Sequence, residues 1–431
     1  MNRTVAVTTL GCKTNQYESA AMEERLIGAG YEILPFEEGA ELVIVNTCTV
    51  TAATDRQSRN LIRRARRLNP AARIVVTGCY AQVAPDKLMN LPGVALVIGN
   101  AEKKEFLDLL QDVADTPRVK VSDIGRTREA VALPLSRFAD RSRAFVQIQN
   151  GCDAFCSYCI IPHARGRSRS LAPDEALEQV RQLVEHGYPE IVLTGIHIGG
   201  YGADLSPATS LHELVARIEE ETAVRRLRLG SIEPTEIPAA LVARMAASQV
   251  VCPHFHIPLQ SGDDEILKRM NRLYDTAFFR RTIMGIHSRM PEGAIGLDVI
   301  VGFPGETEEQ FANTCRFVEE LPATHLHVFP FSKRPGTPAA LMPDQVAAAV
   351  IKERAARLRA LGEEKNRAYA QRFIGRTLEV VVEGGGSVGS RKGLSRNYLQ
   401  ISFPGSEALI GKVVPVKVTA LGDGGLEGSL A

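Results

Sequence analysis

The sequence predicts an α/β protein with three parts: an N-terminal parallel αβα domain, a central barrel of six βα units, and a small antiparallel β-barrel at the C-terminus. Strand and helix patterns alternate over residues 1–113 and again from residue 144, which is typical of parallel βα units. The tail instead holds short strand patterns between glycine turns. A chain of 431 residues has room for these three units.

The N-terminal domain (1–113) is predicted from strands that each lead into a helix or a turn. The strands are expected at 4–10, 41–47, 73–78 and 95–100. Helical periodicity covers 17–29 and 54–68, and the second helix ends at Asn69 because proline follows it. Residues 114–143 are polar and irregular, and we expect a linker there.

The central domain (144–366) is expected to form an open barrel. Its six strand patterns lie at 145–149, 190–195, 226–232, 254–259, 295–303 and 325–331. Six βα units are too few to close an eight-stranded barrel. Capping-box pairs predict two helix starts, Ser210 with Glu213 and Thr307 with Gln310. A long charged helix at 344–370 leads to the C-terminal β-barrel (367–431).

Composition and charge narrow the class of protein. Hydrophobic residues make up 45% and charged residues 23%, which excludes a disordered or fibrous chain. The 51 basic and 50 acidic side chains nearly cancel, so only local clusters can indicate a nucleic-acid partner. No apolar run reaches the roughly 18 residues of a membrane span, and the N-terminus reads as a strand, not as a signal peptide. We therefore expect a cytoplasmic protein with no membrane partner.

A first set of cysteines, Cys12, Cys48 and Cys79, follows three successive predicted strands. The carboxyl ends of parallel strands lie on one edge of the sheet, so the three thiols converge if these strands are neighbours. Three thiolates suit an iron–sulfur cluster or a zinc site and leave one metal position open. The alternative is that each cysteine is a small buried apolar residue.

A second set lies in one loop with the spacing Cys152-x3-Cys156-x2-Cys159, where the first strand of the central domain ends. A [4Fe-4S] cluster normally takes four thiolates, so three from one loop leave a unique iron with free coordination sites. The alternative is zinc, with His163 as the fourth ligand. Cys252 and Cys315 lie outside both sets and are expected to be ordinary thiols.

The second cysteine loop resembles the signature of radical S-adenosylmethionine (SAM) enzymes, whose core is a partial TIM barrel. The whole chain resembles the methylthiotransferase family, which joins an N-terminal three-cysteine domain, a radical SAM core and a C-terminal TRAM β-barrel. The matching motifs are LGCKTNQYES, NTCTVT, TGCYAQ, CSYCIIPHARGRSRS, GSIEP, HIPLQSG, DVIVGFPGETEE and FSKRPGTPA. Within the family, the first and last motifs are most similar to the MtaB type, which makes 2-methylthio-N6-threonylcarbamoyladenosine beside the anticodon of tRNA.

This resemblance implies a set of cofactors and partners. Cys152, Cys156 and Cys159 would hold a [4Fe-4S] cluster that cleaves SAM to a radical, and Cys12, Cys48 and Cys79 an auxiliary [4Fe-4S] cluster that carries the sulfur. Two SAM molecules would serve each turnover, one for the methyl group and one for the radical. The expected partners are the tRNA anticodon stem-loop, an electron donor such as flavodoxin or ferredoxin, and a sulfur source; we assume a monomer.

Other substrates and another class of protein stay open at this point. The same chemistry serves isopentenyladenosine of tRNA or an aspartate of a ribosomal protein in the sister types of the family. A different class is an RNA-binding protein stabilised by metal and without catalysis. Iron in the purified protein would exclude that last reading.

The SAM contacts implied by the resemblance lie near the carboxyl ends of the barrel strands. They are Tyr158, Gly195, Ser231, Glu233, Gln260 and Val301. Competing structural explanations are loop packing for Tyr158, a turn for Gly195, helix capping for Ser231 and Glu233, and core packing for Val301. His254 and His256 alternate on a strand and are expected to be sheet residues, not ligands.

Two arginine clusters are candidates for contacts with RNA phosphates. The first cluster, in the helix at 54–68, consists of Arg56, Arg59, Arg63, Arg64, Arg66 and Arg67. The second cluster, which follows the cysteine loop, consists of Arg165, Arg167 and Arg169. The alternative for the helix is a solvated surface. Tyr398 and Phe403 of the tail either stack on bases or belong to the barrel core.

Overall fold

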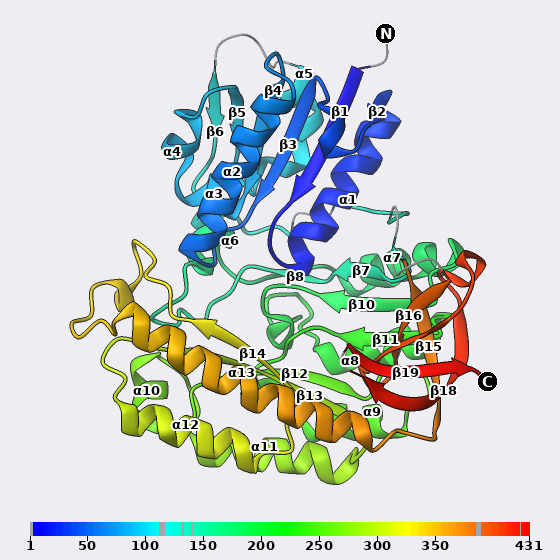
Figure 1. Cartoon of the computed structure of the whole chain (residues 1–431). Helices are drawn as coiled ribbons and strands as arrows, with labels where there is room; N and C mark the ends of the chain where they lie inside the picture. The colour runs from blue at the N-terminus through cyan, green and yellow to red at the C-terminus, as the bar shows by residue number, and fades with distance from the viewer. Residues whose placement is uncertain (1–2, 112–116, 131–132, 139–140, 385–388, 423) are drawn as a thin grey trace.

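Three structural units follow one another along the chain with the predicted architecture (Figure 1). The computed structural model describes residues 3–111, 117–130, 133–138, 141–384, 389–422 and 424–431. In Figure 1 the N-terminal sheet stands above the central barrel, and the C-terminal barrel packs beside it. The predicted α/β fold class is therefore confirmed.

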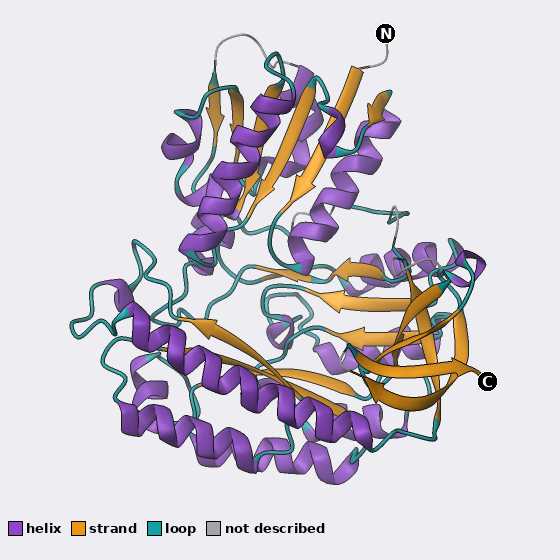
Figure 2. Cartoon of the chain, in the orientation of Figure 1, coloured by secondary structure: helices purple, strands orange, loops and turns teal. Residues whose placement is uncertain are grey.

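The N-terminal domain is a parallel sheet with helices on both faces (Figure 2). Its strands are β1 (Arg3–Thr9), β2 (Tyr31–Ile33), β3 (Leu42–Thr47), β4 (Arg73–Gly78), β5 (Val94–Ile98) and β6 (Arg118–Lys120). Its helices are α1 (Lys13–Gly28), α2 (Ala52–Leu68), α3 (Cys79–Val83), α4 (Pro85–Met89) and α5 (Phe106–Gln111). The strand order is β2-β1-β3-β4-β5-β6. Alternate side chains of the sheet form one apolar cluster with α2 and another with α1 and α5, because successive side chains of a strand point to opposite faces.

Two edge strands of this sheet were not predicted. Both β2 and β6 have three residues, which is too short for alternation to be visible in the sequence. β6 lies in the predicted linker, where Arg118 pairs with Leu96 in the ladder to β5. Phe138 of the same stretch is buried in the main core. The expectation of a purely irregular linker is therefore wrong for these residues, while 114–116, 131–132 and 139–140 lie outside the described residues.

The central domain is the predicted open barrel. Its six parallel strands are β7 (Ala144–Gln147), β10 (Glu190–Thr194), β11 (Arg226–Leu229), β12 (His254–Gln260), β13 (Ala294–Val301) and β14 (His325–Pro330). They form two three-stranded ladders, which single bridges from Leu227 to Val251 and from Ser231 to His256 connect. In the described part of the chain no ladder joins β14 to β7, so the barrel stays open on that side.

Helices cover the outside of this barrel, and a small antiparallel pair, β8 (Gln149–Asn150) and β9 (Arg169–Ser170), flanks the cysteine loop. The helices are α6 (Ile161–Arg165), α7 (Pro173–Glu185), α8 (Leu211–Glu221), α9 (Ala239–Ala247), α10 (Asp264–Arg269), α11 (Thr276–Arg289), α12 (Glu308–Glu320) and α13 (Ala348–Gln371). Both predicted capping boxes are present, at the starts of α8 and α12. A third box, Thr51 with Thr54, starts α2 without the usual Glu or Gln. None of the helices in the described residues has the length and apolar character to cross a membrane.

The C-terminal domain is a closed five-stranded barrel that α13 connects to the core. Its strands are β15 (Thr377–Glu383), β16 (Ser390–Ser395), β17 (Gln400–Pro404), β18 (Val413–Gly422) and β19 (Gly425–Leu430). The turn between β16 and β17 docks on the central barrel, where Tyr398 stacks on His254 with ring centroids 4.1 Å apart. Phe403 is buried inside the small barrel. Base stacking by these two aromatic residues is therefore wrong for this structure, and both serve packing.

Candidate active site

The first cysteine set lies at the edge of the N-terminal sheet that faces the central barrel (Figure 1). β1, β3 and β4 are direct neighbours, and each leads into one cysteine of the set. Cys12 caps α1, Cys48 follows β3, and Cys79 begins α3. A Cβ atom on Gly11 would lie only 2.8 Å from Sγ of Cys48, so the turn before Cys12 brings the chain against Cys48. The topology thus gathers these thiols, as the strand pattern indicated.

The environment of these thiols is uneven. Cys12 is exposed, whereas Cys48 and Cys79 are buried. Burial and the neighbouring Cys79 thiol raise the pKa of Cys48 to about 11. Sγ of Cys79 accepts a hydrogen bond from Nε of Arg165 at 3.1 Å. A thiolate at this buried edge therefore requires positive charge from a neighbour or from a metal.

The second cysteine set lies in the loop between β8 and α6. Gly151 has a φ of +76° and starts this loop, and Cys152 N–H donates to the carbonyl of Gly166 at 3.1 Å. Burial raises the pKa of Cys159 to about 12. Cys156 Sγ accepts a hydrogen bond from Arg272 at 3.2 Å, so a cation from the barrel wall stands beside this thiol.

The donors available in each set bear on the metal that it would hold. A single zinc ion on three thiolates needs a fourth ligand. The candidate for the second set, His163, is exposed, and its ring lies against Phe155. The chemistry of three thiols in each set fits an iron–sulfur cluster in which one iron is left free for another ligand.

A cavity of about 230 Å³ lies between the N-terminal domain and the central barrel, beside Cys159. Val50 and Thr51 contribute the wall from the N-terminal domain, two and three residues after Cys48. Cys159 contributes the wall from the cysteine loop, and Gln260 and Asp298 the wall from the barrel. Its volume lies just below the roughly 300–1,000 Å³ that is usual for a small-molecule site. Residues from both domains thus enclose a space that Cys159 borders.

The predicted SAM contacts fall into three groups. Tyr158 and Gln260 line the cavity. Glu233 pairs with Arg272, the cation beside Cys156, and Ser231 Oγ lies 3.3 Å from Nδ1 of His256. Gly195 is required by close packing, since a Cβ there would lie 2.8 Å from the carbonyl oxygen of Gln149.

Val301 does not match its predicted role. Its side chain is fully buried in the main core cluster, so it has no surface to offer to an adenine. The competing explanation, a core valine, is the correct one. The hydrophobic run of β13 gave no means to tell which of its valines faces the binding region.

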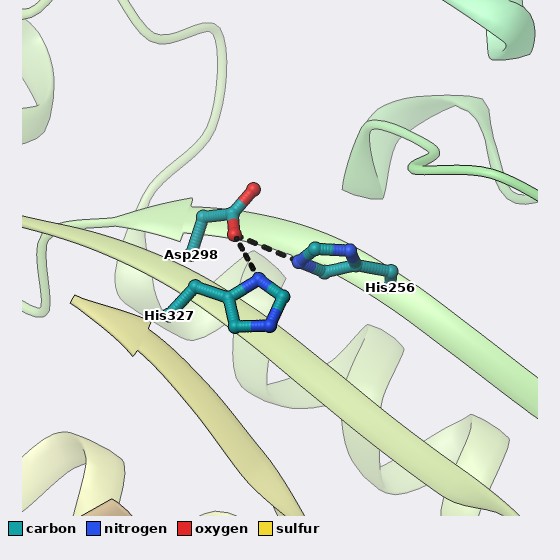
Figure 3. Close-up of side chains that lie close together, drawn as sticks. All are labelled: His256, Asp298 and His327. Atoms are coloured by element: carbon teal, nitrogen blue, oxygen red, sulfur yellow. Dashed lines mark hydrogen bonds and ion pairs between the residues drawn. The ribbon is translucent and has the colours of Figure 1, made fainter. Parts of the chain in front are cut away.

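Sequence reasoning missed an acid–imidazole group inside the barrel (Figure 3). Oδ1 of Asp298 lies 2.7 Å from Nε2 of His256 and 3.3 Å from Nδ1 of His327, and the three residues come from adjacent strands. Burial alone would raise the pKa of Asp298, but the bonds from His256 and His327 outweigh burial and hold the pKa well below its usual range. His256 is a sheet residue of β12, as expected, and its ring points to a carboxylate that lines the cavity.

The predicted RNA-contacting arginines are divided by burial. On α2, Arg59 is half-buried and donates to the Tyr80 hydroxyl at 2.8 Å, whereas the exposed members are Arg56, Arg63, Arg64, Arg66 and Arg67. Arg167 is also exposed and pairs with Asp153.

Arg165 and Arg169 cannot contact RNA in this structure, because both are buried. Arg165 points into the N-terminal domain, and Arg169 donates to the backbone carbonyls of Arg165 and Arg167. The prediction of phosphate contacts for these two residues is wrong. Their burial arises from domain packing, which a run of basic residues in the sequence does not reveal.

Three family models match the chain. The uncharacterized protein family UPF0004 matches residues 4–99, the radical SAM superfamily matches 146–318, and the TRAM domain matches 371–431. Each model covers one of the three structural units described above.

Known proteins of the same length are similar to the whole chain. A threonylcarbamoyladenosine tRNA methylthiotransferase, MtaB, of Bacillus subtilis (strain 168) is 44% identical over 97% of this chain and 94% of its own length. A tRNA-2-methylthio-N(6)-dimethylallyladenosine synthase of Pelotomaculum thermopropionicum (strain DSM 13744 / JCM 10971 / SI) is 35% identical over 96% and 94%. The solved radical S-adenosylmethionine methyltransferase TsrM of Kitasatospora setae shares the fold alone, with a TM-score of 0.58 and 18% identity over 79% of this chain and 75% of that one. This chain therefore belongs to the radical SAM methylthiotransferase family.

Proposed function

We propose that this protein is a SAM-dependent methylthiotransferase that adds a methylthio group to C2 of N6-threonylcarbamoyladenosine, beside the anticodon of tRNA, in the cytoplasm. The observation that carries the proposal is the cavity beside Cys159, to which both domains contribute walls. The relatives support the substrate, because the MtaB protein of Bacillus subtilis is 44% identical over nearly the whole chain.

The residues present fit the cofactors that the family uses, namely SAM and [4Fe-4S] iron–sulfur chemistry. Cys152, Cys156 and Cys159 would hold the cluster that binds SAM. A second cluster on Cys12, Cys48 and Cys79 would carry the sulfur, and each turnover would use two SAM molecules. Tyr158, Gly195, Ser231, Glu233 and Gln260 are the candidate SAM contacts. A sulfur source and an electron donor such as flavodoxin or ferredoxin complete the proposal, with the protein acting as a monomer.

The chemistry explains why an iron–sulfur enzyme is needed. The C2–H bond of adenosine has no acidic proton for a general base, and the bound cofactors supply the carbon radical that side chains cannot. The chain contributes charge and position: Arg272 sets a cation beside Cys156 and pairs with Glu233. The cavity walls from both domains would exclude water from the reacting atoms.

The exposed arginines of α2 are the proposed contact surface for tRNA phosphates. α2 begins at Ala52, directly after the cavity residue Thr51, so this basic surface extends outward from the cavity. Arg167, on the other side of the cysteine loop, adds a further exposed cation. The C-terminal barrel, which matches the TRAM model, would contact the same RNA.

The second candidate substrate is N6-dimethylallyladenosine of tRNA, which the sister type of the family modifies. The synthase of Pelotomaculum thermopropionicum supports it at 35% identity. The higher identity to MtaB favours the threonylcarbamoyl nucleoside.

Mass spectrometry of nucleosides tests the proposal. Anaerobically reconstituted protein would be incubated with SAM, a reductant and tRNA from a strain that lacks its own methylthiotransferases. We expect the methylthio-threonylcarbamoyl nucleoside to form with the wild type and with Cys315→Ala, and not with Cys156→Ala or Cys48→Ala. Cys48→Ala should still cleave SAM. Formation of the methylthio-dimethylallyl nucleoside instead would favour the second candidate substrate. A purified protein that contains zinc and no iron would refute radical chemistry altogether.

A further inference from the structure

A buried arginine connects the two cysteine sets. Arg165 is the last residue of α6, six residues after Cys159, and its side chain is fully buried. Its Nε donates to Sγ of Cys79 at 3.1 Å, and its terminal nitrogens bind the carboxylate of Glu18 and the side-chain oxygen of Asn15. The Arg165 side chain thus connects the segment that follows the second cysteine set to Cys79 of the first set.

Arg165 and Cys79 border a buried group of charged side chains. Lys103 is also buried and binds Glu18, so two basic side chains face one carboxylate. The sulfur of a metal-bound Cys79 would add a second negative charge beside Arg165, and buried charges are stable only when they are compensated. Burial alone would raise the pKa of Glu18, but Arg165 and Lys103 outweigh burial and lower it to about 2. Glu18 therefore holds the guanidinium in place instead of competing for a proton.

A second arginine makes a similar link between the domains without touching a cysteine. Arg334 is buried and donates to Oγ1 of Thr49 at 2.6 Å and to Oδ2 of Asp55 at 2.7 Å. Like Arg165, it starts in the central domain and ends in the N-terminal domain. Both arginines therefore connect the two domains, but of the two Arg165 alone contacts a thiol. A comparison of their variants distinguishes the thiol contact from domain docking.

We propose that Arg165 is a positioning residue that binds the Cys79 thiolate, tunes the reduction potential of the auxiliary cluster, and fixes that cluster relative to the radical SAM loop. The inference rests on the proposed function in one respect, namely that Cys79 is a cluster ligand. Hydrogen bonds and charge near the ligating sulfurs set the potential of an iron–sulfur cluster. A buried guanidinium on a sulfur favours the reduced state, because reduction adds negative charge.

The test measures the auxiliary cluster by itself. In a full-length background with Cys152, Cys156 and Cys159 replaced by alanine, the variants are Arg165→Gln, Arg165→Lys and the matched control Arg334→Gln. Each protein is reconstituted anaerobically, its iron and sulfide are counted, and its cluster is titrated with a redox dye under electron paramagnetic resonance.

We expect Arg165→Gln to lower the ratio of reduced to oxidised cluster at a fixed potential about tenfold, which is about 59 mV for one electron. Arg165→Lys keeps the charge and loses the planar guanidinium, so its reduction potential should lie between those of the parent and Arg165→Gln. The reduction potential of Arg334→Gln should equal that of the parent. If Arg165→Gln assembles no cluster, iron retained by Arg334→Gln still assigns the loss to Arg165 and not to docking of the two domains in general. Equal potentials in all four proteins, or equal cluster loss in both glutamine variants, would overturn the inference. If the parent itself binds no iron, the proposed function fails instead.

Discussion

The loop that carries Cys152, Cys156 and Cys159 depends on a glycine that nothing larger can replace. At Gly151, φ is +76° and a Cβ would lie 1.8 Å from the carbonyl oxygen of Arg167, a backbone atom that no side-chain rotation can move. Gly187, at the end of α7, has a φ of +87° and open space around its Cβ position. The two glycines therefore share a left-handed backbone conformation, but an added Cβ would clash with the backbone at Gly151 and not at Gly187.

Gly151→Ala and Gly187→Ala form a matched pair whose difference measures this clash. An alanine in the left-handed region costs roughly 1–2 kcal/mol at either site. At Gly151 the loop must also move to relieve the clash, and the Cys152 N–H···O bond to Gly166 is lost at about 1 kcal/mol. With the strain of moving the backbone, we expect Gly151→Ala to be less stable than Gly187→Ala by about 2 kcal/mol or more.

Urea unfolding of the two variants and the rate of 5′-deoxyadenosine formation from SAM are the readouts. Gly187→Ala should cleave SAM at the wild-type rate. Gly151→Ala should lose iron and slow SAM cleavage more than tenfold, because the thiols no longer converge. The reasoning is refuted if Gly151→Ala unfolds at the same urea concentration as Gly187→Ala and keeps its iron and SAM cleavage.

Three further predictions follow from the charged groups. Glu18→Gln removes the carboxylate that Arg165 and Lys103 share and should cost about 3–5 kcal/mol of unfolding free energy at pH 7. Because the folded pKa of Glu18 is lowered to about 2, this stabilisation is present above roughly pH 4.3 and is lost as the pH falls toward 2. The pH dependence of urea unfolding in that window should therefore be flatter in the variant. Asp298→Asn removes the anion that His256 and His327 share and should slow thiomethylation about tenfold, with unchanged iron content. A wild-type rate in the nucleoside assay would show that the carboxylate is dispensable. The double variant Arg63→Glu, Arg67→Glu should weaken tRNA binding and reduce the slope of log affinity against log salt by about 2. The control Arg281→Glu on α11 should change neither the affinity nor the slope. Equal effects of the double variant and the control would exclude α2 as the RNA surface.

The parts of the site that the sequence predicts are those that depend on topology alone. A cysteine directly after each of three parallel strands must reach the same sheet edge once the strands are neighbours, and Cys12, Cys48 and Cys79 do so. The spacing within one loop likewise brings Cys152 and Cys156 together whatever the rest of the fold does.

The parts that could not be predicted depend on register and on packing between domains. Asp298 meets His327 because β13 and β14 pair in a particular register, which a single strand pattern does not contain. Arg165 carries the same charge as Arg167 and lies two residues away in a similar context, but one is buried and the other exposed. That difference arises from the N-terminal domain, whose residues in contact with Arg165 lie 86 to 150 residues earlier in the chain.

The docking of the C-terminal barrel has a consequence for how this protein tolerates sequence change. Arg226 and Arg228, themselves buried, donate to the main-chain carbonyls of Leu394 and Ser395 at the end of β16 and of Arg396 in the turn that follows. Carbonyl acceptors are present whatever side chain a residue has, so these three contacts do not depend on the side chains of Leu394, Ser395 and Arg396. The stacking of Tyr398 on His254 in the same turn does depend on the side chain. The faces of the small barrel that lie away from this contact can therefore diverge between species or be redesigned without loss of these backbone hydrogen bonds.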